Sequence, residues 1–308
     1  MIFKSLVIIL SVILSMAFFT LLERKLLAYI QIRKGPNKVS IMGIPQPIAD
    51  AIKLLMKEWV KPIRANRWLF IISPLMMLLI ALIMWSLIPF KNTYMFFQLS
   101  LLMFLVIMSL NVYPSLTSGW ISNSKYASVG ALRAVAQTIS YEITMAIALL
   151  SPILICASFS MNKIMEIQTK WWTLFILPTS LIIWLLAILA ETNRTPFDLV
   201  EGESELVSGF NVEYSSVGFT LIFMAEYTSI LLMSTITSIV FLGGSLYLNM
   251  NMVVFMMMKA LMVSAVLIWV RGTMPRMRYD MLMKLTWTIM LPMTLSIMAL
   301  ALSASTIS

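Results

Sequence analysis

The chain contains no histidine and a single cysteine, Cys156. Four-thiolate clusters and His-ligated metal or haem sites need several such side chains. No glycine-rich phosphate loop occurs either. The sequence therefore predicts that this chain alone binds no metal, flavin or iron–sulfur cluster. If it takes part in redox chemistry, we expect the electron carriers to sit on partner subunits.

Charge is also scarce, since only 11% of the 308 residues are charged and 60% are hydrophobic. Ordinary soluble domains are about 25% charged, so a water-soluble globule is excluded. The net charge of +9 could suggest nucleic acid. However, the basic residues form no patch interleaved with aromatics and lie on no recognisable binding fold. We expect membrane lipid, and no nucleic acid, as a partner.

Long apolar runs predict an all-α integral membrane protein of about eight transmembrane helices, because a span needs about 20 apolar residues. We expect one polytopic domain over 1–308 rather than a separate soluble part. Met1–Leu22 could be a signal peptide, but a cleaved signal should end in small residues, and this run enters Glu23-Arg24-Lys25 through Ala17-Phe18-Phe19-Thr20. It is therefore expected to stay as a span. The predicted spans lie near 2–22, 68–90, 97–118, 131–157, 171–190, 216–241, 252–270 and 285–304.

Basic residues are distributed unevenly over the connecting segments. Segments 23–67, 119–133, 191–215 and 271–284 share one side and hold 17 of the 22 Lys and Arg residues. The positive-inside rule places this side in the cytoplasm or matrix and both termini outside.

The first of these segments contains its own periodic pattern. The apolar residues Ile48, Ile52, Leu55 and Trp59 recur at helical spacing, while Asp50, Lys53 and Lys57 point elsewhere. This pattern predicts an amphipathic helix in the membrane surface. From periodicity alone, a surface anchor is the favoured interpretation.

Two predicted spans carry a carboxyl near mid-bilayer. Glu142 lies nine residues beyond Arg133, about 13 Å at 1.5 Å per residue, and Glu226 lies at a similar depth beyond Ser216. Charged groups at this depth usually face a bundle interior and mark an ion or proton path. The alternative is a protonated carboxyl that bonds one helix to another. For the pair we favour proton transport.

The segment from 191 to 213 is strongly acidic, with Arg194 as its single basic residue. A solvated loop would be the default interpretation of such a charge run. The loop could instead continue the line of buried carboxyls and deliver protons. Its acidic members are Glu191, Asp198, Glu201, Glu203, Glu205 and Glu213.

Several motifs spread over nearly the whole chain are specific. The most specific is Ala190-Glu191-Thr192-Asn193-Arg194-Thr195-Pro196-Phe197-Asp198-Leu199, which leads into Glu201-Gly202-Glu203-Ser204-Glu205. Others are Leu22-Glu23-Arg24-Lys25, Gln46-Pro47-Ile48-Ala49-Asp50-Ala51, Ser140-Tyr141-Glu142 and Met224-Ala225-Glu226-Tyr227. Together these motifs resemble the family of the first mitochondrially encoded subunit of complex I, and the resemblance covers nearly the whole chain.

The resemblance implies a core membrane subunit of the proton-pumping NADH:ubiquinone oxidoreductase in the mitochondrial inner membrane. Both termini would then face the intermembrane space. Ubiquinone would be the substrate, and the other subunits of the peripheral and membrane arms would be the partners.

The same resemblance implies two sets of site residues. Those along the quinone path would be Arg24, Gln31, Arg33, Asp50, Phe223 and Met224. Those of the proton route would be Glu142, Glu191 and Glu226, fed by Asp198, Glu201, Glu203, Glu205 and Glu213.

Three other functions are consistent with parts of the pattern. A related membrane-bound hydrogenase module would have similar helices without using quinone. A self-sufficient ion transporter would also need buried carboxyls, although no inverted repeat is evident. A purely structural membrane anchor would leave the mid-bilayer carboxyls and the acidic loop unexplained.

Overall fold

Helices make up most of the chain in the computed structural model, which describes residues 2–63, 65–89, 97–199, 202, 209–244 and 252–307. No strand occurs within these ranges. Seven helical segments are long and apolar enough to cross a membrane. The predicted class, an all-α integral membrane protein, is therefore confirmed.

The seven long segments include one that is built from three consecutive pieces. These are α12 (Tyr279–Lys284), the π-helix η2 (Leu285–Met290) and α13 (Leu291–Ile307). The other six are α1 (Ile2–Ile30), α3 (Arg67–Trp85), α4 (Ser100–Ile121), α5 (Lys125–Cys156), α10 (Ser216–Val240) and α11 (Met252–Thr273). The shorter elements are α2 (Gln46–Met56), α6 (Met161–Ile167), α7 (Thr173–Ile176), α8 (Pro178–Glu191) and η1 (Gly209–Asn211).

The span expected over 171–190 is not one continuous helix. α7 ends at Ile176, Leu177 leaves the helical region, and Pro178 begins α8. Proline has no N–H to donate and fits the first turn of a new helix. With 14 residues, α8 is about 21 Å long, shorter than the roughly 30 Å of hydrocarbon.

α1 also differs from its predicted extent, because it runs eight residues beyond Leu22, to Ile30. Glu23, Arg24 and Lys25 therefore sit on a regular helix rather than in a connecting segment. Consecutive helical positions point in different directions. The three charges accordingly have different environments, since Glu23 is buried and Arg24 is exposed.

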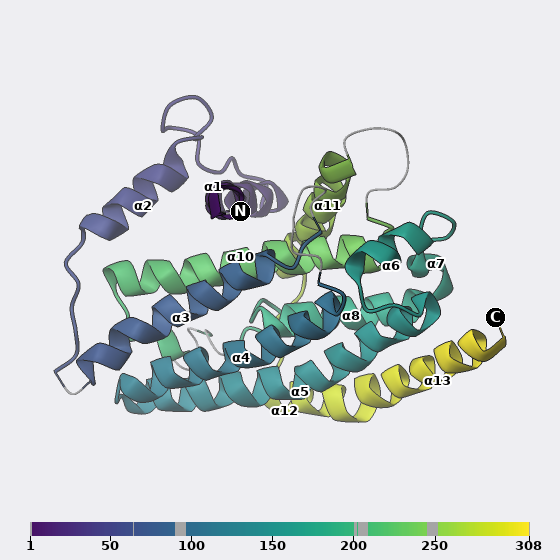
Figure 1. Cartoon of the computed structure of the whole chain (residues 1–308). Helices are drawn as coiled ribbons and strands as arrows, with labels where there is room; N and C mark the ends of the chain where they lie inside the picture. Colours follow the sequence, from purple (N-terminus) through teal and green to yellow (C-terminus); the bar gives the residue numbers. More distant parts are fainter. Residues whose placement is uncertain are drawn as a thin grey trace.

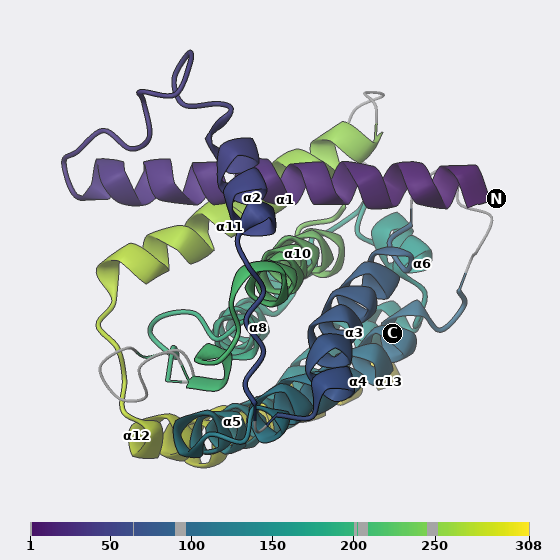
Figure 2. The ribbon, with the colours of Figure 1, turned by 90° about the vertical axis from the view of Figure 1, so that its left-hand side faces the viewer.

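α10 lies at the centre of the bundle. α3, α4, α5 and α10 run side by side, and α13 follows α5 (Figure 1). Figure 2 shows that α1 lies across α10 and α11, with α2 resting against it. Every residue of the chain from Ile230 to Phe241 is buried. The second half of α10 is thus enclosed by other helices.

Hydrogen bonds join separate parts of the chain at both ends of α10. At one end, the Ser216 hydroxyl donates to the carbonyl of Lys57 at 2.6 Å, and the Met277 amide donates to that of Pro196 at 2.9 Å. At the other end, the Leu174 amide donates to the Phe241 carbonyl at 3.2 Å. Segments that the charge distribution assigns to the basic side therefore contact one another.

One close approach shapes the basic end of α5. A Cβ on Gly130 would lie 2.8 Å from Cα of Gly209, which no side chain tolerates without movement. Gly130 therefore lets η1 rest directly on α5. This contact places Phe210 of η1 against the interior of the bundle, where it is buried.

Candidate functional site

Two of the predicted carboxyls, Glu191 at the end of α8 and Glu226 on α10, line one cavity of about 50 Å³. A buried water needs roughly 10–15 Å³ of such space and two to four polar partners, so the cavity has room for about three. Its other polar lining residues are Asn111, Ser115, Thr138, Thr192, Asn193 and Ser229.

Glu142 joins this group from α5. It is half-buried and close enough to Glu191 to interact with it electrostatically. One carboxyl oxygen of Glu142 and one of Glu191 are buried without a hydrogen-bond partner among the described residues. Burying such a group costs free energy unless it is protonated or hydrogen-bonded. The arrangement therefore suits carboxyls that exchange protons with one another through water.

The acidic segment contributes residues of different kinds. Asp198 pairs with Arg276 at 3.2 Å, and its side chain is 15% exposed. Glu213 is half-buried. Glu201, Glu203 and Glu205 lie outside the described residues. The Asp198–Arg276 pair therefore joins the segment that follows α8 to the stretch that precedes α12.

Tyr214, the neighbour of Glu213, fixes this part of the chain to α3. Its ring stacks on Phe70 with centroids 4.2 Å apart, and its hydroxyl lies 2.9 Å from that of Ser73. Burial raises the pKa of Tyr214 to about 12, against the opposing effect of its hydrogen bond with Ser73. The phenol thus stays neutral at physiological pH and acts as an anchor.

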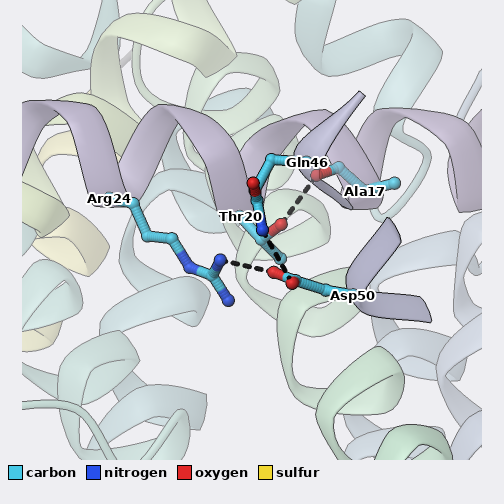
Figure 3. A network of polar contacts seen from close by, with 5 residues as sticks. All are labelled: Ala17, Thr20, Arg24, Gln46 and Asp50. Carbon is cyan, nitrogen blue, oxygen red and sulfur yellow. Dashed lines mark hydrogen bonds and ion pairs between the residues drawn. The ribbon is translucent and has the colours of Figure 1, made fainter. Parts of the chain in front are cut away.

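Among the residues expected near the quinone entrance, Arg24 and Asp50 are brought together. The Arg24 guanidinium donates to Asp50 Oδ2 at 2.5 Å, and Gln46 Nε2 donates to Asp50 Oδ1 at 2.9 Å (Figure 3). This network joins α1 to α2. Gln31 and Arg33 follow the end of α1 and are exposed, and neither belongs to the network.

Phe223 and Met224 lie half-buried on α10, which packs against both α1 and α2. Phe223 contacts Phe219, with ring centroids 4.4 Å apart, and Tyr227, with centroids 6.0 Å apart. A row of aromatic rings therefore follows this helix from its first turns towards the level of Glu226.

Sequence reasoning missed Glu23, which is the most buried of the three adjacent charges Glu23, Arg24 and Lys25, at 5% exposure. Its carboxylate pairs with Arg271 of α11 and, at 3.5 Å, with Arg194. The Arg194 guanidinium also lies 4.6 Å from the ring centre of Tyr227. A usable signal was present, because Val12, Met16, Phe19 and Glu23 follow the 4-3-4 spacing of a buried helix face.

The Glu23 cluster borders a second cavity, of about 20 Å³, which Arg194, Arg271 and Thr192 also line. Thr192 lines the first cavity as well. Thr192, the residue that follows α8, therefore lies against both the cavity of the ion cluster and the carboxyl cavity.

Comparison with known proteins gives a consistent family. The sequence profile of the NADH dehydrogenase family matches residues 3–302. The NADH-ubiquinone oxidoreductase chain 1 of Lampetra fluviatilis is 50% identical over 305 residues, 98% of this chain and 95% of the relative. That of Aedes aegypti is 50% identical over 293 residues, which cover 95% and 92%. That of Sminthopsis macroura is 49% identical over 291 residues, which cover 94% and 92%.

Identity near 50% over nearly the full length of both chains, together with the all-helical membrane fold, leaves one assignment. This chain belongs to the NADH-ubiquinone oxidoreductase chain 1 family, a core membrane subunit of an oxidoreductase complex.

Proposed function

We propose that this chain forms part of the quinone-binding chamber of NADH:ubiquinone oxidoreductase and links it to a path of carboxyls that carries protons. One observation supports the proposal above all: Glu191 and Glu226 line the same polar cavity, and Glu142 stands beside Glu191. Structural hydrogen bonding alone does not require two carboxyls around a water-sized cavity and a third carboxyl, Glu142, that interacts with one of them.

The quinone part of the proposal rests on α1, α2 and α10, which pack against one another. An isoprenoid quinone needs an apolar slot for its tail and a few placed donors for its headgroup. Phe223 and Met224 supply apolar surface on α10. Arg24 and Asp50 supply a charged pair, and Gln31 and Arg33 provide polar groups at the exposed end of α1.

Ubiquinone is the proposed substrate, and its electrons would come from carriers on partner subunits of the peripheral arm. Among the residues that the structure describes, no group of three or more His, Cys, Asp or Glu side chains is placed to hold a metal ion. The contribution of this chain is then to bind and orient the quinone and to respond to its charge.

Reduction of quinone to quinol takes up two electrons and two protons, so the local charge changes when protons arrive later than electrons. The Glu23 cluster, with Arg194 and Arg271, lies between α1 and the cavity and would sense this change. Glu191, Glu226 and Glu142 would adjust their protonation in turn. Partner subunits would convert the adjustment into pumping, and Asp198, Glu201, Glu203, Glu205 and Glu213 would supply protons.

The proposed function is tested by NADH-dependent reduction of ubiquinone by the purified assembly in liposomes, measured together with proton uptake. The proposal expects both activities and copurification of flavin and iron–sulfur subunits. Reduction of protons without quinone reduction would instead identify a hydrogenase module. Proton flux through the isolated subunit would identify an independent transporter.

Arg24→Ala is expected to raise the apparent KM for short, water-soluble quinones, because the guanidinium donates hydrogen bonds and sets the local potential without exchanging protons. Arg24→Lys keeps the charge but loses the planar donor fork, so its defect should be intermediate. Steady-state kinetics normalised to assembled complex measure both.

Lys38→Ala serves as the matched control, because Lys38 is an exposed basic residue in the loop after α1. Its KM should stay at the wild-type value. An unchanged KM in Arg24→Ala would remove Arg24 from the quinone path and leave it a headgroup anchor.

Sidedness gives a separate prediction for the mitochondrial inner membrane. The segments 23–67 and 191–215 should be reachable from the matrix, and both termini from the intermembrane space, as the distribution of basic residues indicates. Protease and tag accessibility in mitoplasts and inside-out vesicles measure this. Cleavage of either segment from the intermembrane side would overturn the proposed topology.

A further inference from the structure

The end of α10 that is farther from the basic loops is held by a lysine from another helix. Lys259 of α11 donates from Nζ to the carbonyl of Leu242 at 2.5 Å and to that of Gly244 at 3.1 Å. Leu242 and Gly244 follow Val240, the last residue of α10, so these carbonyls belong to the turn that leads away from the helix end. Backbone carbonyls are strong acceptors that need a hydrogen-bond partner when they are buried. A cation is therefore well placed here.

Aromatic rings fix the position of this cation. The Lys259 ammonium lies 4.6 Å from the ring centre of Trp172 and 4.5 Å from that of Phe255. Gly243, at φ +73°, allows the chain to turn beneath Trp172, because a Cβ there would lie 2.7 Å from the indole ring. Cation–π attraction and two carbonyl bonds thus act on one ammonium group.

The stretch from the end of α6 to the first residue of α7 holds the same helix end from a second direction. Gln168 and Thr173 both donate to the carbonyl of Val240, Thr173 at 2.6 Å. The Val240 end of α10 is therefore fixed by two unconnected parts of the chain. Neither part supplies a lining residue to the carboxyl cavity.

Glu226 is 14 residues before Val240 on the same helix, about 21 Å along its axis. Nearly all residues between them are buried among other helices, and Ser229 alone is half-buried. A closely packed helix moves as a unit, so a displacement at its end reaches the cavity. An axial shift of α10 would move Glu226 relative to Glu191, which is carried by α8.

We propose that Lys259 is a positioning residue which, by clamping the Leu242–Gly244 carbonyls, holds α10 in the register that keeps Glu226 at the cavity facing Glu191. The proposal rests on the proposed function of Glu226. Lys259 acts through α10 and touches no carboxyl of the path.

The test compares Lys259→Met, Lys259→Arg and Lys163→Met in the assembled complex in liposomes. Methionine keeps the unbranched apolar stem without the charge, and arginine can still donate to carbonyls and stack on aromatic rings. Lys163 is an exposed cation on α6 and serves as the matched control. Small misplacements of reacting groups, even when caused by a distant mutation, can lower rates about 100-fold. Proton transfer through water tolerates some change in the distance between the carboxyls. We expect proton pumping by Lys259→Met to fall roughly threefold to tenfold.

Lys259→Arg and Lys163→Met should stay within about twofold of the wild type. Amide hydrogen exchange at Ile239–Phe241 should quicken in Lys259→Met only. If Lys259→Met merely reduces the amount of assembled complex, and the assembled enzyme pumps normally, the positioning role is overturned.

A double variant separates this inference from the proposed function. Lys259→Met added to Glu226→Gln should cause no further loss of pumping, because the clamp acts through Glu226. Additive losses would overturn the inference. If Glu226→Gln pumps normally, the proposed function of Glu226 fails and the positioning role fails with it. A defect in Glu226→Gln with normal Lys259→Met would overturn the inference alone.

Discussion

Glu23→Gln is expected to lower the stability of the assembled complex by about 2–3 kcal/mol, more than any exposed charge change on α1. Removing one partner of a buried ion pair typically costs about 3–5 kcal/mol, because the remaining charge stays buried without compensation. Here the change leaves two guanidinium groups, Arg194 and Arg271, without their shared anion. The expected loss of stability is smaller than this typical cost because solvent screens the charge of Arg271, whose side chain is 33% exposed.

The thermal midpoint at which the subunit leaves the complex measures this effect. Asp50→Asn is the comparison for stability, because the Arg24–Asp50 pair is 53% and 32% exposed and such pairs contribute about 0–1 kcal/mol. Equal shifts of the midpoint in the two variants would show that the buried cluster does not stabilise the helix packing.

Glu142→Gln and Glu226→Gln should each lower quinone reductase activity coupled to pumping by at least about tenfold while leaving the fold intact. An amide keeps the shape of the carboxyl but exchanges no proton, and such proton transfer contributes about 100-fold or more to rates. NADH oxidation and proton uptake by liposomes, normalised to assembled complex, give the result.

Glu166→Gln is the matched control, since Glu166 is an exposed carboxyl on α6 and lines neither cavity. It should retain wild-type activity and stoichiometry. A normal proton-to-electron ratio in both Glu142→Gln and Glu226→Gln would remove them from the relay.

The lengths of the apolar runs predict where most helices lie. They do not predict where α1 ends or where the chain breaks between α7 and α8. α1 continues through Glu23-Arg24-Lys25 because these residues form helix well, although their charge ends the apolar run. The break before Pro178 has the opposite cause. Leu177 and Pro178 both belong to an apolar stretch, yet the missing N–H of proline and the conformation of Leu177 divide α7 from α8.

The candidate site shows the same division between local and tertiary information. The depth of Glu142 and Glu226 along their helices follows from residue counting, which is a local property. Their convergence on Glu191 depends on how α8 packs between α5 and α10, and no periodic pattern encodes that placement. Residue counting could not predict the ion pairs of Glu23, because its partners Arg194 and Arg271 lie more than 170 residues away in the sequence.

Infrared difference spectroscopy of quinone reduction tests the central proposal most directly, because protonated carboxyl groups absorb apart from carboxylates. Reduction of bound ubiquinone in the wild-type complex should change the protonated-carboxyl absorption. Glu191→Gln and Glu226→Gln should each remove part of that change, and Glu166→Gln should leave it intact. Identical difference spectra in the wild type and in both cavity variants would contradict the coupling of quinone chemistry to these carboxyls.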